Sequence, residues 1–181
     1  ICNLANFPAN APGRNFVLAP SRHGTPVAAF CLLGRTFMRP VDCPFRAVDR
    51  VLSQLPSDVR HILVDIHAEA TADKYLIAHH LRGRVSAVIG THTHVPTADE
   101  QIFPEGTAFL CDVGMTGPYS GILGRKPDRV LPTHIDFIPR PFDIASDDVR
   151  LGGVLIDTED HTGKATAITR LMVRENELTA S

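Results

Sequence analysis

The sequence lacks the long apolar runs and the charge bias that would direct it to a membrane or to nucleic acid. None of its 181 residues falls in a stretch of about 18 consecutive apolar residues, which a membrane-spanning helix needs. The first residues also lack the basic-then-apolar order of a signal peptide. No run of lysines and arginines forms a basic stripe, and the formal net charge is −2. We therefore expect a cytoplasmic protein without membrane attachment and without general nucleic-acid binding.

Cysteine is scarce and shows no metal-binding or redox spacing. There is no C-x-x-C motif among the four cysteines, which are Cys2, Cys31, Cys43 and Cys111. This usage predicts free thiols in a reducing compartment. The chain also has no serine or cysteine nucleophile motif, so catalysis by such a nucleophile is not expected.

What the sequence does contain is typical of a globular α/β protein. Apolar residues make up 44% of the chain and charged residues 21%, without repeats or low-complexity tracts. These features favour a single domain over residues 1–181. The chain begins at Ile1 and runs at once into a segment rich in proline and glycine, residues 6–13, so we expect an incomplete domain that is entered midway.

Near-continuous apolar runs alternate with helical spacing along most of the chain. Such runs predict buried parallel strands at residues 27–33, 61–66, 85–89 and 107–111. Helices are predicted around residues 45–55 and 72–81, and a glycine-rich loop over residues 114–124. Residues 152–157 and 165–169 flank a Thr-Gly turn and predict an antiparallel hairpin. The alternation indicates an α/β fold with a mainly parallel sheet.

Three histidines follow the predicted strands at their carboxyl ends. His67 ends one apolar run, and His92 and His94 follow the next run in Gly90-Thr91-His92-Thr93-His94. Open parallel sheets bind ligands beyond the carboxyl ends of their strands, and neutral imidazole is a common metal ligand. The pattern predicts a metal site formed by His67, His92 and His94. In the alternative, His92 and His94 are ordinary loop residues and His67 is a core histidine bonded to a carboxylate.

Several longer segments resemble the YmdB-like family of calcineurin-type metallophosphoesterases. The resemblance rests most tightly on residues 61–124, including Asp65-Ile66-His67-Ala68-Glu69, Gly90-Thr91-His92-Thr93-His94 and Asp112-Val113-Gly114-Met115-Thr116-Gly117. It extends to Asn6-Phe7-Pro8 and Leu33-Gly34-Arg35-Thr36-Phe37-Met38, and so covers nearly the whole chain.

The resemblance implies a calcineurin-like α/β sandwich that lacks its N-terminal strands and helices, and a site with two divalent metal ions, iron or manganese. His67 and His92 would bind one ion and His94 the other. Ions about 4 Å apart would hold a phosphodiester and supply a bridging hydroxide for in-line attack. The implied activity is hydrolysis of 2′,3′-cyclic nucleotides or related small phosphodiesters.

The sequence departs from the family pattern in its first part. Family members carry a Gly-Asp motif, a Glu-Asn pair and an Asn-His pair upstream, which supply the other ligands and the histidine that protonates the leaving oxygen. These motifs are absent here, and Asp112 matches a later family segment, so it is not assigned as a ligand. We expect a fragment that is inactive alone. The alternatives are a non-catalytic metal-binding or regulatory remnant, and a purely structural domain that binds no metal.

Further polar residues are candidates for supporting roles. Asp65 and Glu69 flank His67 and are candidates to orient a ligand imidazole, or they form ordinary surface pairs. Gly114, Thr116 and Gly117 are candidates to contact substrate phosphate through backbone N–H groups, with ordinary loop geometry as the alternative.

Overall fold

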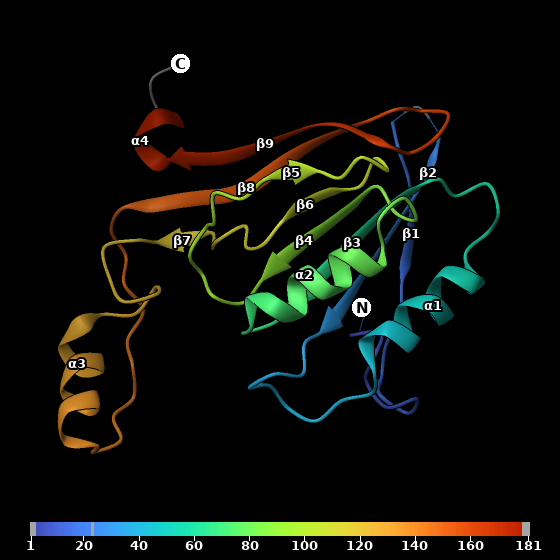
Figure 1. The fold of residues 1–181 in the computed structure, drawn as a ribbon. Helices are drawn as coiled ribbons and strands as arrows, with labels where there is room; N and C mark the ends of the chain where they lie inside the picture. The colour runs from blue at the N-terminus through green and yellow to red at the C-terminus, as the bar shows by residue number, and fades with distance from the viewer. Residues whose placement is uncertain (1–2, 23, 179–181) are drawn as a thin grey trace.

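In a computed structural model, which describes residues 3–22 and 24–178, two β-sheets and four helices follow one another along the chain. Figure 1 shows the arrangement. The elements are β1 (Val17–Pro20), β2 (Pro26–Leu33), α1 (Pro44–Gln54), β3 (His61–His67), α2 (Thr71–His80), β4 (Ala87–Thr91), β5 (Gln101–Ile102), β6 (Ala108–Leu110), β7 (Gly117–Pro118), α3 (Pro127–Asp136), β8 (Val149–Thr158), β9 (Ala165–Arg174) and α4 (Glu175–Leu178).

The larger sheet has the order β1-β2-β3-β4-β6-β5. Its four central strands, β2, β3, β4 and β6, are parallel, and the two edge strands pair antiparallel. These central strands overlap the four apolar runs, which confirms the predicted parallel sheet, although β4 lies two residues later than predicted. Because parallel neighbours end at the same edge, the residues that follow β3, β4 and β6 are brought close together.

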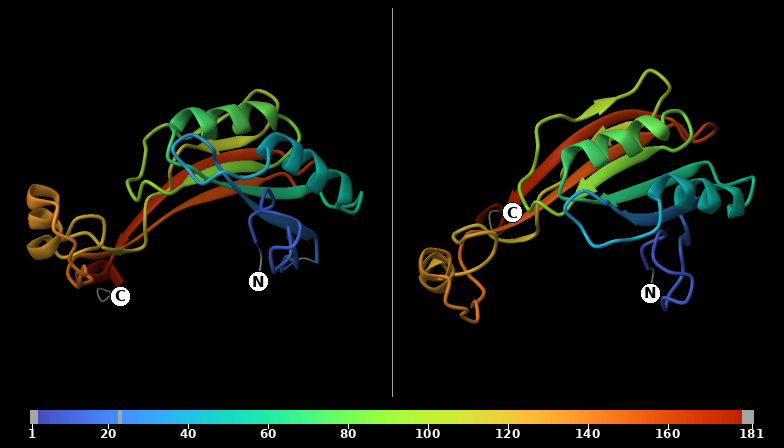
Figure 2. Two further views of the ribbon diagram at one scale, coloured as in Figure 1. Left: turned by 90° about the horizontal axis from the view of Figure 1, so that it is seen from below. Right: turned by 60° about the horizontal axis from the view of Figure 1, so that its bottom comes forward.

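The two faces of this sheet are covered by different elements, in keeping with the alternation of side chains along a strand. Ile62, Val64 and Val88 belong to the main core, which includes apolar residues of α1 and α2. Both helices lie on the same side of the sheet in the left view of Figure 2. Leu63 and Ala87 belong instead to a second, smaller cluster with residues of β8 and β9. The sheet is therefore packed between helices and a β-hairpin.

The predicted hairpin is present and longer than the sequence indicated. β8 and β9 pair antiparallel, with Arg150 opposite Arg174 at one end and Thr158 opposite Ala165 at the other, and β7 joins them in a three-stranded sheet. The two residues of β7 lie within the segment 114–124, which was predicted to be loop.

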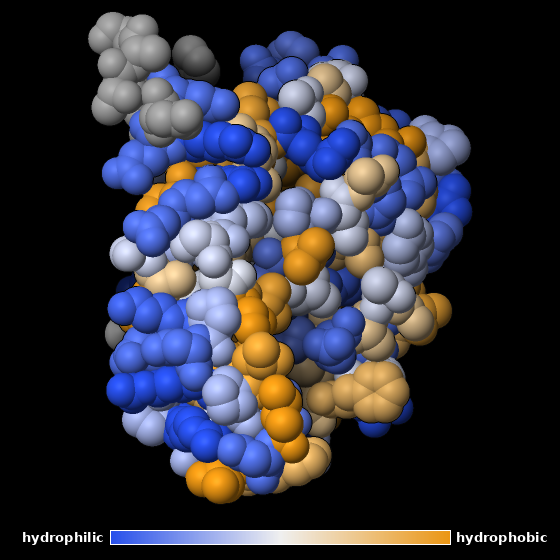
Figure 3. Space-filling model, turned by 90° about the vertical axis from the view of Figure 1, so that its left-hand side faces the viewer, coloured by the Kyte–Doolittle hydropathy of each residue, from blue (hydrophilic) through white to orange (hydrophobic). Residues whose placement is uncertain are grey.

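The segment after β7 stands away from the larger sheet (Figures 1 and 2). It contains α3, of which only Val130 is buried, and many of its apolar side chains are exposed. Apolar side chains gather over the lower part of the face shown in Figure 3, where this segment lies. The exposed large apolar residues of this segment are Ile122, Leu123, Leu131, Ile135, Phe137, Ile138, Phe142 and Ile144.

The structure bears on the predictions about membrane spans and free thiols, for the residues that it describes. No helix in the described part of the chain combines the length and the apolar composition that crossing a membrane requires. Cys31, Cys43 and Cys111 are thiols rather than disulfides, whereas Cys2 lies outside the described residues.

Candidate functional site

The three predicted histidines lie where the carboxyl ends of the central parallel strands meet, at a side of the larger sheet that we call the histidine edge. His67 is the last residue of β3 and pairs in register with Thr91, the last residue of β4. His92 follows directly, and His94 comes two residues later. The apolar strands place these residues, because burial of β3 and β4 fixes the register that sets His67 beside the end of β4.

The structure brings the rings of His67 and His92 together. His67 Nε2 lies 3.0 Å from His92 Nδ1. His67 Nδ1 lies 2.9 Å from the Thr91 hydroxyl, which in turn donates a hydrogen bond of 2.8 Å to Asp65 Oδ1. Since the Thr91 proton goes to Asp65, the Thr91 oxygen accepts the proton of His67 Nδ1. In a neutral His67, Nε2 therefore carries a lone pair.

The second ring is oriented in a corresponding way by Glu69. His92 Nε2 lies 3.1 Å from Glu69 Oε2, and an ionised carboxylate only accepts hydrogen bonds. A neutral His92 that donates its Nε2 proton to Glu69 presents a lone pair at Nδ1 as well. Burial, followed by the neighbouring His92, lowers the pKa of His67 below its ordinary value, which favours the neutral ring. When both rings are neutral, two lone pairs face each other and a cation between them would satisfy both, whereas a proton on His92 Nδ1 would form a hydrogen bond to His67 Nε2.

The donor set of this pair fits one metal ion. Two imidazole nitrogens that bind an ion at about 2.1 Å and at right angles to each other lie about 3.0 Å apart. Ligand histidines commonly give their other N–H to a carboxylate or a hydroxyl, as both rings do here. Asp65, acting through Thr91, contacts His67, and Glu69 contacts His92, whereas their role as supports of metal ligands stays a prediction.

His94 is not part of this pair. It is exposed, and its backbone has a φ of 65°. Within residues 3–22 and 24–178, no three or more His, Cys, Asp and Glu side chains converge as a metal-binding group. The structure therefore brings together two of the three predicted ligands, and the metal-binding role of all three stays a prediction.

A buried ion pair lies below the turn that carries His92 and His94. Lys74 Nζ of α2 contacts Asp112 Oδ2 at 2.8 Å, and their side chains are 0% and 1% exposed. Asp112 also accepts hydrogen bonds from the Thr93 hydroxyl at 2.7 Å, the Thr93 amide at 3.0 Å and the Gly114 amide at 2.9 Å. Lys74 was not predicted from the sequence, since a lysine within a helix normally lies on the surface.

The electrostatic state of Asp112 follows from these contacts. Burial alone would raise the pKa of the carboxyl group, but the Lys74 ammonium and the donors from Thr93 and Gly114 outweigh it. The pKa of Asp112 is therefore held below its ordinary value. Asp112 is therefore ionised, and both of its carboxylate oxygens accept hydrogen bonds from other groups of the protein.

A further pair of hydrogen bonds links α2 to the loop after the histidines. The Tyr75 hydroxyl donates to Asp99 Oδ2 at 2.7 Å, and Asp99 Oδ1 accepts from the Cys111 amide at 3.2 Å. The hydrogen bond to Asp99, with burial adding to it, raises the pKa of Tyr75 to about 12. These two hydrogen bonds connect α2, the loop after the histidines and the residue that follows β6.

The raised pKa predicts a late titration that is simple to observe, because the chain has two tyrosines and no tryptophan. In the Tyr119→Phe variant, near-ultraviolet absorbance should show Tyr75 ionising near pH 12 in the folded protein. The same variant in urea should titrate near the ordinary value of about 10. The folded state holds the proton more tightly, so this contribution to stability is complete below about pH 10 and declines as pH rises toward 12. A folded-state midpoint near 10 would contradict the assignment.

The three residues predicted to contact phosphate, Gly114, Thr116 and Gly117, have different surroundings from one another. The Gly114 amide is engaged by Asp112, and a side chain there would meet Pro96 Cδ at 2.9 Å with φ at +82°. Thr116 is exposed, and its hydroxyl lies 3.4 Å from the Gly152 carbonyl oxygen. Gly117 lies in β7 opposite Arg150. Close packing explains the glycine at 114, and substrate contact by any of the three stays a prediction.

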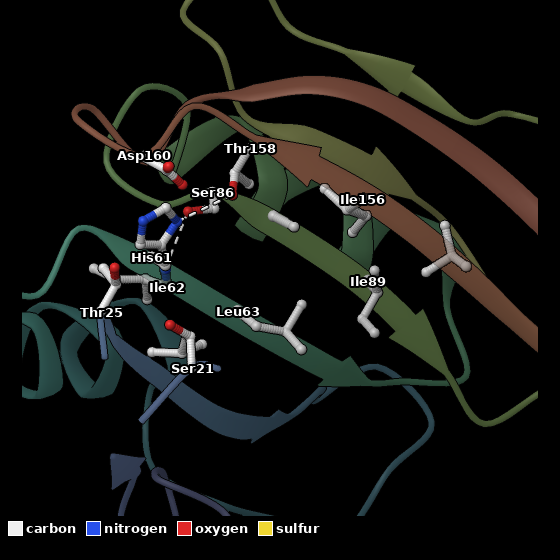
Figure 4. A pocket seen from close by; sticks show the side chains of 13 residues that line it. Ser21, Thr25, His61, Ile62, Leu63, Ser86, Ile89, Ile156, Thr158 and Asp160 are labelled. Atoms are coloured by element: carbon white, nitrogen blue, oxygen red, sulfur yellow. Dashed lines mark hydrogen bonds between the residues drawn. The ribbon is translucent and has the colours of Figure 1, made fainter. Parts of the chain in front are cut away.

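An apolar cleft of about 370 Å³ lies elsewhere, between the larger sheet and β8. In Figure 4 Leu63 and Ile89 point into it from one side and Ile156 from the other. At one end of the cleft, His61 Nδ1 lies 3.0 Å from the Thr158 hydroxyl. Its lining includes His61 at the start of β3, and none of His67, His92 and His94. The cleft is thus separate from the histidine edge.

Comparisons with known proteins agree with this architecture. A family model described as YmdB-like protein matches residues 1–171. The chain is 41% identical over 174 residues to the 2′,3′-cyclic-nucleotide 2′-phosphodiesterase of Bacillus subtilis (strain 168), a match that covers 96% of this chain and 66% of that protein. The chain thus spans just under two thirds of the length of this relative.

Two solved structures have the same fold. A hypothetical protein from Thermus thermophilus superposes with a TM-score of 0.90 at 38% identity, covering 96% of this chain and 67% of that one. A structure described as a novel phosphatase from Mycoplasma pneumoniae gives a TM-score of 0.86 at 24% identity, covering 99% and 66%. The second likeness concerns the fold alone, and both structures agree with the predicted α/β fold.

Proposed function

Because this chain belongs to the YmdB-like protein family, within the metallophosphoesterase superfamily, we propose that it carries part of the active site of a metal-dependent phosphodiesterase. The proposed substrates are 2′,3′-cyclic nucleotides or related small phosphodiesters, in line with the activity named for the Bacillus subtilis relative. The proposed cofactors are two divalent ions, iron or manganese. The single observation that carries the proposal is the close approach of two ring nitrogens, His67 Nε2 and His92 Nδ1, which lie 3.0 Å apart at the ends of neighbouring parallel strands.

In this proposal His67 and His92 hold one ion, and His94 belongs to the ligand set of the second. The remaining ligands and the proton donor to the leaving oxygen come from motifs that this chain does not contain. The ions would polarise the phosphodiester and lower the pKa of a water that attacks phosphorus. The residues of this chain orient the ligands: Asp65 acts through Thr91 on His67, and Glu69 acts on His92.

The test is replacement of His92 by asparagine in the complete gene product. Asparagine tolerates positive φ better than most residues, so the variant should keep the backbone of this turn, where His92 has a φ of 112°. Loss of a metal ligand should lower the turnover of 2′,3′-cyclic AMP by about 100-fold or more. The protein should also be purified with less bound metal.

The matched control is His161→Asn, at an exposed histidine of the turn between β8 and β9. It should retain full activity and full metal content. If His92→Asn is as active as the wild type while both remain folded, the proposed role of His92 is wrong. If the wild type itself binds metal but hydrolyses no phosphodiester, the chain belongs to a metal-binding protein without this activity.

A further inference from the structure

The turn that carries His92 and His94 has an unfavourable backbone. His92 has a φ of 112° and His94 a φ of 65°, and both values lie where residues with a side chain are rare. Such conformations persist only where the surrounding structure fixes them by additional contacts. Some group in this protein must therefore hold the turn in place.

Thr93, between the two histidines, supplies the contacts. Its amide and its hydroxyl both donate to Asp112 Oδ2, at 3.0 and 2.7 Å. The same oxygen accepts from Lys74 Nζ at 2.8 Å, and the other carboxylate oxygen accepts from the Gly114 amide. The middle residue of the turn is thus hydrogen-bonded to a carboxylate that is itself held by Lys74 of α2 and by the Gly114 amide.

A buried ion pair is a poor source of net stability, because removing both charges from water offsets most of their attraction. Lys74 and Asp112 are nonetheless almost completely buried, one on α2 and one after β6. An apolar pair of similar size would fill the space but would provide no acceptor for Thr93. The location of the charge, directly below the turn, points to a role in positioning.

We propose that Lys74, Asp112 and Thr93 form a positioning unit that holds His92 and His94 in the geometry needed to bind metal. Lys74 keeps Asp112 ionised and in place, and Asp112 fixes the turn through Thr93. The unit acts through the histidines and touches neither metal nor substrate. The metal-binding part of this inference rests on the proposed function, whereas the fixing of the turn does not.

The test compares Thr93→Val with Thr93→Ser, which leave the Lys74–Asp112 pair intact and so avoid the unfolding that loss of a buried charge could cause. Valine matches threonine in shape and lacks the hydroxyl, whereas serine retains it. We expect Thr93→Val to weaken Co²⁺ binding by about tenfold or more and to change the ligand-field absorption of the bound ion. Thr93→Ser should bind Co²⁺ within about twofold of the wild type.

Hydrogen exchange in the metal-free protein separates this inference from the proposed function. Thr93→Val should accelerate exchange of the amides at positions 93 and 94, while amides in the middle of β3 and β4 exchange as in the wild type. Exchange unchanged at positions 93 and 94 would overturn the positioning role, whether or not metal binds. If exchange is accelerated in Thr93→Val but the wild type binds no Co²⁺, the positioning role stands and the proposed metal site is wrong. Equal Co²⁺ affinity in Thr93→Val and the wild type would show that the unit does not serve metal binding.

Discussion

Replacing Lys74 with methionine should lower the free energy of unfolding by about 3–5 kcal/mol, the range found when one partner of a buried ion pair is removed. Methionine is close to lysine in length and fills the same apolar path, so loss of packing contributes little. The cost arises because Asp112, fully buried, loses its only described counter-charge. Urea denaturation followed by circular dichroism measures the change.

Two variants control for this interpretation. Lys126→Met, at an exposed lysine before α3, should change stability by less than about 0.5 kcal/mol. In the double variant Lys74→Met with Asp112→Asn, the cost should be smaller than the sum of the two single costs, because the unpaired charge is gone. A Lys74→Met variant as stable as the wild type would show that the pair is not needed to keep Asp112 buried.

Replacing Gly90 with alanine should also be strongly destabilising, with a loss of about 3 kcal/mol or more, at the upper end of what overpacking costs. A methyl group at this position would lie 1.7 Å from the Cys111 carbonyl oxygen and 2.8 Å from Cδ of Lys74. The first contact is with backbone, so β4 and the segment after β6 would have to separate. Since Gly90 precedes the histidine turn, the same movement should also abolish binding of Co²⁺.

The matched control for Gly90→Ala lies in the hairpin. Alanine at Gly153 of β8 would meet only Leu151 Cδ2, at 3.9 Å, which is an ordinary contact. Gly153→Ala should therefore leave stability within about 1 kcal/mol of the wild type. If the two glycine variants have the same midpoint of thermal unfolding, the close approach of Cys111 does not constrain position 90.

The central strands could be predicted because burial on both faces leaves a plain apolar signal in the sequence. The edge strand β1 was not predicted: its residues are apolar but all four are exposed, and the run is short and ends in Pro20. Helix α3 was missed for a similar reason: only Val130 is buried in it, and Pro132 within it normally indicates the end of a helix. Elements that bury little are specified only weakly by the hydrophobic pattern.

The candidate site could be predicted only as far as strand order determines it. Strand ends placed His67 and His92 side by side, and the structure does so with nitrogens 3.0 Å apart. The position of His94 depends instead on an unusual backbone conformation, which no periodicity reveals. Lys74 could not be recognised either, because its partner Asp112 is 38 residues away and the two meet only in the folded protein.

The order of the parallel strands also determines when in folding the site can form. The β8–β9 hairpin pairs residues close in sequence, which is a fast, local event. Pairing β3 with β4, and β4 with β6, requires the chain to close longer loops before any contact compensates for the lost entropy. His67, Thr93 and Asp112 meet only after both pairings exist. The histidine edge therefore forms only after these two pairings, and a nascent chain cannot bring His67 and His92 together before β3 pairs with β4.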